Sequence, residues 1–207
     1  MHAARSRFAF IAALALAAVP GIGSAEGWRA SGSSDLLTPL GEYALVGGGV
    51  ADFTEGAVKD RFGTAGTWDV RLGLGSRYYV GAELGYVGSR RSGTGASPDL
   101  TANGAEGVLR VQVPYATGNW LIEPFVFGGI GWSHLALGHA AAAGLKTTDD
   151  VGVVPFGGGI TFGFGRILLD ARFTYRANFD EDLKLAANEG PAKLSQWAVG
   201  ASVGYEF

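Results

Sequence analysis

The side chains in this sequence that could do chemistry are carboxylates and arginines that recur at alternate positions of several segments. The acidic members are Asp69, Glu83, Glu106, Glu123 and Asp170, and the basic members are Arg71, Arg110, Arg172 and Arg176. Such groups can act as general acids and bases, or they can neutralise one another in a buried network. Because an unpaired charge removed from water is costly, we predict a paired network, with an acid–base catalytic set as the alternative.

The segments that carry these charges change character with a period of two residues. Between Thr67 and Gly75, for example, Trp68 and Val70 fall on one face while Asp69 and Arg71 fall on the other. Side chains of a strand point alternately to opposite faces, so the pattern predicts strands with one apolar face and one polar or small face. We predict eight of them, at about Tyr43–Phe53, Thr67–Gly75, Tyr78–Val87, Gly104–Pro114, Trp120–His134, Val153–Phe164, Ile167–Arg176 and Trp197–Phe207.

The connections between these segments alternate in length. Short turns that contain Gly, Ser or Asn occur at 75–77, 115–119 and 165–166, and longer polar stretches lie at 54–66, 89–103, 135–152 and 177–193. Transmembrane barrels have short periplasmic turns and longer external loops. The order therefore predicts an all-β fold, an eight-stranded antiparallel up-and-down transmembrane β-barrel.

The polar face must point inward in such a barrel, while the apolar face must meet lipid. A barrel of this size is just wide enough to be filled by side chains, so the inward charges need partners. Aromatic residues near the segment ends match the interfacial girdles of membrane barrels. They are Trp68, Tyr78, Tyr86, Trp120, Trp132, Phe164, Tyr175, Trp197 and Tyr205. A soluble sandwich, which would bury the apolar face instead, is the alternative.

The composition indicates one domain and excludes several chemistries. The chain has 207 residues, a formal charge of −3 and no basic run, so we expect no nucleic-acid partner. It has no cysteine, which excludes disulfides and thiolate metal sites. Glycine is over-used at 35 residues, and the runs 47–49 and 157–159 inside predicted strands would make room for bulky neighbours in a small barrel.

The first residues are typical of an export signal. Arg5 and Arg7 precede the apolar run 8–19, and small residues at 23–25 suit cleavage after Ala25. We predict a signal peptide at 1–25, a periplasmic leader at 26–41 and the barrel at 42–207. No other segment is long and apolar enough for a membrane-spanning helix, so we expect insertion by strands.

Two motifs resemble those of a known family. The last segment reads Trp197-x-Val199-x-Ala201-x-Val203-x-Tyr205-x-Phe207, and the fifth contains the Pro-aromatic, glycine-rich run 123–131. Over about 41–207 the chain thereby resembles the OmpA-like eight-stranded outer-membrane β-barrels. The resemblance implies insertion into a Gram-negative outer membrane by the barrel assembly machinery through the last strand, with Trp197, Val203, Tyr205 and Phe207 as the assembly signal. The family's peptidoglycan-binding domain is not found, so we expect no cell-wall tether.

Other candidate sites are weaker. Some lipid A-modifying barrels use His and Ser near the outer leaflet, but His134 is followed by Leu135 and Ala136 rather than by the deacylase-like x-Ser-Asn. His139 with Asp149 and Asp150 could bind a metal only loosely. We therefore predict no catalytic residue, no metal and no cofactor.

The expected partners lie in the membrane. Arg90, Arg91 and Lys146 fall in predicted external loops, where they could meet lipopolysaccharide phosphates. We predict a monomeric structural or surface-interaction barrel with a filled lumen and no catalysis. The alternatives are a narrow channel for small hydrophobic or polar solutes, which inward Phe125 and Phe127 would favour, and a lipid A-modifying enzyme.

Overall fold

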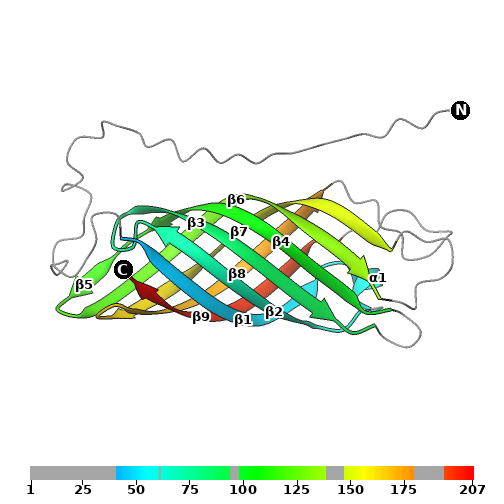
Figure 1. The fold of residues 1–207 in the computed structure, drawn as a ribbon, viewed down its shortest axis with the longest axis horizontal. Coiled ribbons are helices and arrows are strands. Elements are labelled where there is room, and N and C mark those ends of the chain that lie inside the picture. Colours follow the sequence, from blue (N-terminus) through cyan, green and yellow to red (C-terminus); the bar gives the residue numbers. More distant parts are fainter. Residues whose placement is uncertain (1–40, 61, 94–97, 139–146, 180–193) are drawn as a thin grey trace, which may run out of the picture.

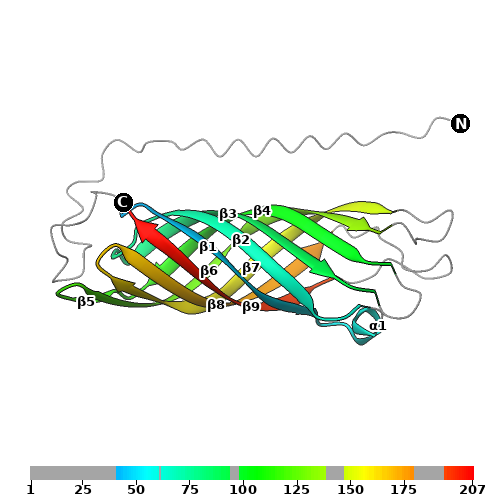
Figure 2. The ribbon, with the colours of Figure 1, turned by 60° about the horizontal axis from the view of Figure 1, so that its bottom comes forward.

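Antiparallel strands of one sheet wrap into a closed barrel (Figures 1 and 2). The computed structural model describes residues 41–60, 62–93, 98–138, 147–179 and 194–207, and residues 1–40 with the predicted signal peptide and most of the leader lie outside this range. The elements are β1 (Tyr43–Phe53), α1 (Gly56–Lys59), β2 (Ala65–Leu74), β3 (Val80–Arg91), β4 (Leu100–Gln112), β5 (Tyr115–Thr117), β6 (Trp120–Leu137), β7 (Thr148–Phe164), β8 (Ile167–Phe179) and β9 (Gln196–Glu206).

Closure is achieved by pairing between the first and last strands. β1 pairs with β9 from Tyr43↔Glu206 to Phe53↔Gln196, and β4 pairs with β6 across the rest of the wall. The short β5 pairs with β6 after a break at Val113–Pro114, because proline cannot donate a ladder hydrogen bond. β5 thus continues β4, and the predicted eight-stranded antiparallel barrel is confirmed.

The two ends of the barrel differ. The short turns gather at one end with β5 and the C-terminus, which we call the turn end, and α1 marks the opposite loop end (Figure 1). At the loop end the strands run further than predicted: β3 continues to Arg91, β4 begins at Leu100 and β7 begins at Thr148. Outward positions there include polar residues such as Asn103 and Thr148, so the outward apolar face ends while the hydrogen-bond ladder continues.

The outer surface carries a continuous apolar belt. Ile130 is 73% exposed and Leu109 is 66% exposed, values that a soluble protein would not give its strand-centre aliphatic residues. Aromatic pairs flank the belt, with Trp120–Phe164 at the turn end and Trp68–Tyr86 at the loop end, at ring separations of 4.9 and 5.2 Å. The apolar face therefore meets lipid, and the soluble-sandwich alternative is wrong.

The interior is filled in three layers. A small apolar cluster lies at the turn end, formed by Tyr43, Leu45, Leu121 and Leu168. Charged residues occupy the middle. The loop-end cluster, a larger apolar group, closes the other end and consists of Phe53, Val58, Phe62, Leu100, Leu135, Val151, Val153 and Leu194. Within the described residues, no helix has the length and apolarity needed to cross a membrane.

Candidate functional site: the charged lumen

Glu83 is the acceptor at the centre of the lumen. Its carboxylate accepts hydrogen bonds from Arg110 Nη1 at 2.6 Å, from Arg172 Nη1 and Nη2 at 2.9 and 3.1 Å, and from the Tyr43 hydroxyl at 2.7 Å. These partners come from β4, β8 and β1, while Glu83 lies on β3. One carboxylate thus ties together strands from opposite walls of the barrel.

A second carboxylate, Asp170, extends the network along β8 and β2. It accepts from Arg172 Nε at 2.7 Å and from the Thr161 hydroxyl at 3.1 Å, and its Oδ1 lies 3.7 Å from Arg71 Nη1. Arg71 in turn pairs with Asp69 at 3.1 Å. Glu83 and Asp170 are 5% and 2% exposed, so these charges are held inside the protein by one another.

Aromatic rings cover the guanidinium planes. The Arg110 guanidinium carbon lies 3.8 Å from the centre of the Phe125 ring, and that of Arg172 lies 5.3 Å from the centre of Phe127, distances typical of cation–π contacts. Glycine makes room for these rings, because a Cβ on Gly159 would lie only 2.7 Å from the Phe125 ring. The inward Phe125 and Phe127 therefore pack on charges rather than line an apolar channel.

The first short turn closes the turn end of the lumen. Arg77 has a φ of 64° and is 1% exposed, so its side chain folds into the barrel rather than into solvent. Its backbone N–H donates to Glu123 Oε2 at 3.0 Å, its Nε to Glu206 Oε2 at 3.2 Å and its Nη2 to the Gly165 carbonyl at 3.0 Å. The turn thereby contacts β6, β9 and the turn between β7 and β8.

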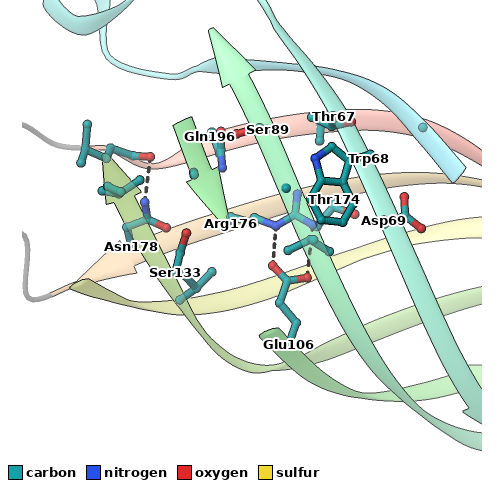
Figure 3. Close-up of a pocket in the computed structure, with 18 of the residues that line it drawn as sticks. Thr67, Trp68, Asp69, Ser89, Glu106, Ser133, Thr174, Arg176, Asn178 and Gln196 are labelled. Carbon is teal, nitrogen blue, oxygen red and sulfur yellow. Dashed lines mark hydrogen bonds and ion pairs between the residues drawn. The ribbon is translucent and has the colours of Figure 1, made fainter. Parts of the chain in front are cut away.

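On the loop side of the network lies a cavity whose floor is polar (Figure 3). Arg176 binds both oxygens of Glu106, with an Nη2–Oε2 distance of 3.2 Å, and this pair separates the cavity from a smaller space beside Glu83. The space open to water is about 50 Å³ in the cavity and about 10 Å³ in the smaller one. The smaller space beside Glu83 can hold only about one water molecule.

Arg91 occupies the loop end of the cavity. It lies over the Phe53 ring at 3.8 Å, donates to the Ala51 carbonyl at 3.2 Å and donates to the Gln196 side-chain oxygen. Asp52 is 3.9 Å away and also binds Lys59 Nζ at 3.0 Å. Arg91 was expected to meet lipopolysaccharide in an external loop. That expectation is wrong, because β3 continues and turns Arg91 inward, where it is 2% exposed.

The charged residues predicted for the lumen all lie on the inner face of their strands. Glu123 is 3.4 Å from Arg110 Nη2 and also meets Arg77, so it links the central network to the turn end. Sequence reasoning missed Arg77, Arg91 and Glu206. Glu206 already falls on the inward face of the predicted last strand, and Arg91 could have been found by extending the alternation of its strand, whereas nothing in the sequence shows that a turn residue such as Arg77 folds inward.

The predicted assembly residues lie on the outer face at β9. Val203, Tyr205 and Phe207 are 48%, 42% and 49% exposed, and Trp197 is half-buried. Tyr205 and Phe207 contact each other at a ring separation of 5.7 Å. They are thus placed where a protein or lipid outside the barrel can reach them.

His134 and its neighbours lie outside the lumen. His134 Nδ1 is 2.8 Å from Asp150 Oδ1, and both side chains are exposed, whereas Ser133 lines the inner cavity. Because adjacent strand residues point to opposite faces, Ser133 and His134 do not form a nucleophile–base pair. His139 and Lys146 lie outside the described residues, and among the described ones no group of three or more His, Cys, Asp or Glu could hold a metal.

One exposed ion pair lies on the outer side of the barrel wall at the loop end. Arg90 Nη2 binds Asp99 Oδ2 at 3.2 Å, with 76% and 44% of the two side chains exposed. The Arg90 hydrogen bond, with help from the Gly93 N–H, lowers the pKa of Asp99 from its ordinary value. Of the neighbouring arginines Arg90 and Arg91, Arg90 is thus the one that points out of the lumen.

Solved structures share this fold. The N-terminal β-barrel domain of Pseudomonas aeruginosa OprF matches with a TM-score of 0.50 and 11% identity over 81% of this chain and 99% of that one. Neisserial surface protein A matches with a TM-score of 0.53 and 11% identity over 82% of this chain and 98% of that one. No protein-family model and no curated protein sequence matches the chain. The likeness shows that the chain shares the closed eight-stranded antiparallel barrel fold of these two outer-membrane proteins.

Proposed function

We propose that this protein is an outer-membrane barrel that acts as a closed structural or surface-interaction element, without conduction or catalysis. The outer belt and its aromatic borders support residence in a membrane. The fold shared with OprF's barrel domain and with Neisserial surface protein A supports the outer membrane as the location. The filled interior supports a lumen that is closed to ions.

The observation that carries the proposal is the ion network across the middle of the lumen. Arg110 and Arg172 reach Glu83 from different walls, and Arg77 seals the turn end through Glu123 and Glu206. The water space beside Glu83 is about 10 Å³, too small for a file of hydrated ions. An ion would have to break several buried charge pairs in order to pass.

Conductance in planar bilayers tests this function. We expect no steady open level for the refolded wild-type protein. A Glu83→Ala/Arg110→Ala/Arg77→Ala variant should conduct, since it removes charge pairs at both constrictions while leaving the outer belt intact. Folding of each protein is checked by its heat-dependent migration on a gel. A steady ohmic pore in the wild type would favour the narrow-channel alternative and overturn the proposal.

The proposed partners follow from the outer surface. The exposed stripe of Val203, Tyr205 and Phe207 supports recognition by the barrel assembly machinery through β9, together with Trp197. Arg90 is exposed beyond the loop-end aromatic border, where lipopolysaccharide phosphates would lie in an outer leaflet. We also propose that the protein is a monomer in this membrane, because the barrel closes its own sheet edges through β1 and β9.

A further inference from the structure

The inner face of the last strand carries few side chains of any size. Small residues fill this side of the seam between β1 and β9: Gly47, Gly49 and Ala51 on β1, and Ala198, Gly200, Ser202 and Gly204 on β9. β8 ends at Phe179 and β9 begins at Gln196, so no tight turn aligns β9 with its neighbour. Since Gly-rich strands specify their register weakly, packing inside the lumen does little to align the strand that closes the barrel.

Shifts of one residue and of two residues along this seam have different consequences. A shift of one would turn Ser202 and Glu206 of β9 outward to the lipid side, which the membrane disfavours. A shift of two keeps every side chain on its face and would set Gly49 opposite Ala198 or Ser202. Ser202 already fits opposite Gly47 in the observed register, so small residues would still face one another. Something other than packing must exclude the shift of two.

β9 carries long inward side chains only at its two ends, and a buried arginine holds each of them. At the turn end, Arg77 Nε donates to Glu206 Oε2 at 3.2 Å. At the loop end, Arg91 donates to the Gln196 side-chain oxygen. Arg77 lies in the turn that leads into β3 and Arg91 is the last residue of β3, and they are 1% and 2% exposed. The two ends of one strand therefore hold the two ends of another.

These contacts depend on the position of β9 along its axis. A shift of two residues moves a strand by about 7 Å, far beyond the length of a hydrogen bond. A shift toward the loop end would carry Glu206 to a position facing Leu45, inside the apolar cluster at the turn end. The opposite shift would withdraw the carboxylate from Arg77, whose buried side chain would lose its ion pair. Either result is unfavourable, because a buried charge needs its partner.

We propose that Arg77 and Arg91, the register clamps, fix the alignment of β9 and thereby select this barrel over closed barrels shifted by two residues. Each long side chain alone could follow a small displacement, whereas the two together hold both ends of β9 at once. Ser202 adds a contact between them, with its hydroxyl 3.2 Å from Arg71 Nη1. Buried polar groups set the register of coiled coils in the same way. The role of the clamps is independent of whether the lumen conducts.

Engineered disulfides report the register, because the chain has no cysteine of its own. Val50 lies opposite Val199 in the observed register and would lie opposite Trp197 or Ala201 after a shift of two. Val50→Cys with Val199→Cys is therefore the observed-register pair, and Val50→Cys with Trp197→Cys or with Ala201→Cys is an off-register pair. A lipid-soluble oxidant is added to the protein folded in vesicles, and a non-reducing gel detects the internal link.

In the otherwise wild-type protein, the observed-register pair should be oxidised at least about tenfold faster than the off-register pairs. Diagonal positions lie about 7–8 Å apart, which is more than a disulfide spans. Equal rates for the two kinds of pair would show that the register is not fixed, and would overturn the proposal.

Removal of the side chains that the clamps hold should release the register. In Glu206→Ala/Gln196→Ala, oxidation of an off-register pair should rise at least about tenfold, because the shifted barrels no longer break the clamp contacts. Glu106→Gln is the control, since it also breaks a buried ion pair, that with Arg176, but between β4 and β8. It should leave the off-register rates as low as in the wild type. Low off-register rates in folded Glu206→Ala/Gln196→Ala would overturn the proposal.

A variant that fails to fold is decided by fixing its register in advance. Val50→Cys/Val199→Cys, oxidised before refolding, should restore the heat-dependent gel shift to Glu206→Ala/Gln196→Ala. A disulfide between Val111→Cys and Val126→Cys, which face each other across β4 and β6, should not restore it. No rescue by the first disulfide, or equal rescue by both, would contradict a role of the clamps in register.

Discussion

At the scale of single residues, Glu83 connects strands that face each other across the lumen. It accepts from Arg110, Arg172 and Tyr43 while 5% of it is exposed, so its charge is fully committed to its neighbours. A pair on the surface would differ, because water and salt screen it. The same type of contact therefore has very different consequences inside and outside the wall.

Glu83→Gln should destabilise the barrel strongly. The substitution keeps the volume but leaves two buried guanidiniums without their shared carboxylate, and loss of one partner from a buried ion pair costs about 3–5 kcal/mol. Urea-induced unfolding of the refolded protein in lipid vesicles measures the change. Asp99→Asn is the control, because it breaks the exposed pair with Arg90, and it should leave the unfolding midpoint unchanged. Equal midpoints for the two variants would show that the network contributes no stability.

At the scale of elements, the seam between β1 and β9 depends on glycine. A Cβ on Gly49 would lie 2.6 Å from Gly200 Cα and would overlap the Val199 carbonyl oxygen, both of which are backbone atoms of the facing strand. These atoms cannot move aside as a flexible side chain would. The last pairing of the barrel thus requires a position without a side chain.

Gly49→Val should impair closure of the barrel. We expect a loss of the heat-dependent gel shift or a destabilisation of at least about 1–3 kcal/mol, the usual cost of overpacking. Gly107→Val provides the comparison, because a Cβ at Gly107 has no atom within 4 Å, and this variant should fold. A Gly49→Val protein that folds and unfolds like Gly107→Val would contradict the close approach at this seam.

The sequence predicted the elements well and their loop ends poorly, for one physical reason. Alternation reveals a strand only where one face meets lipid, so β1 was predicted with its observed bounds. Beyond the loop-end aromatic border the pattern changes, because polar residues point outward while apolar residues such as Leu100, Leu135 and Val151 point inward. There Asn103, His134 and Asp150 continue the ladder with polar outward side chains, so the predicted strands end too early and Arg91 falls in a predicted loop.

The central charges could be predicted as a set but not as pairs. Their inward positions follow from the period of two. Which arginine meets which carboxylate depends on the stagger between strands, and this stagger brings Arg172 of β8 to Glu83 of β3, 89 positions apart in sequence. No local pattern in the chain contains that information.

At the scale of the whole molecule, the belt fixes how the barrel lies in a bilayer. Along β6, Val126 lies midway between Trp120 and Trp132 and is 61% exposed. Thr148 of β7 is exposed beyond the loop-end border. The two positions therefore sample the middle of the hydrocarbon layer and the aqueous side of its boundary.

An arginine at Val126 should be much less tolerated than one at Thr148. Exposure of the charge at the bilayer midplane costs about 2–4 kcal/mol, and near the interface about 0–1 kcal/mol. The free energies of unfolding of Val126→Arg and Thr148→Arg in vesicles provide the comparison. Similar values for the two variants would mean that the belt does not lie in hydrocarbon.

The inward-folded Arg77 has a practical consequence for work on this protein. Its turn looks from the sequence like a spare connector, yet its backbone and side chain are bonded to Glu123, Glu206 and Gly165. An epitope tag or spin label grafted there would break the contacts with which Arg77 closes the turn end of the lumen. Asn119, which is exposed in the turn between β5 and β6 and has no positive φ, is the safer graft point on the same end.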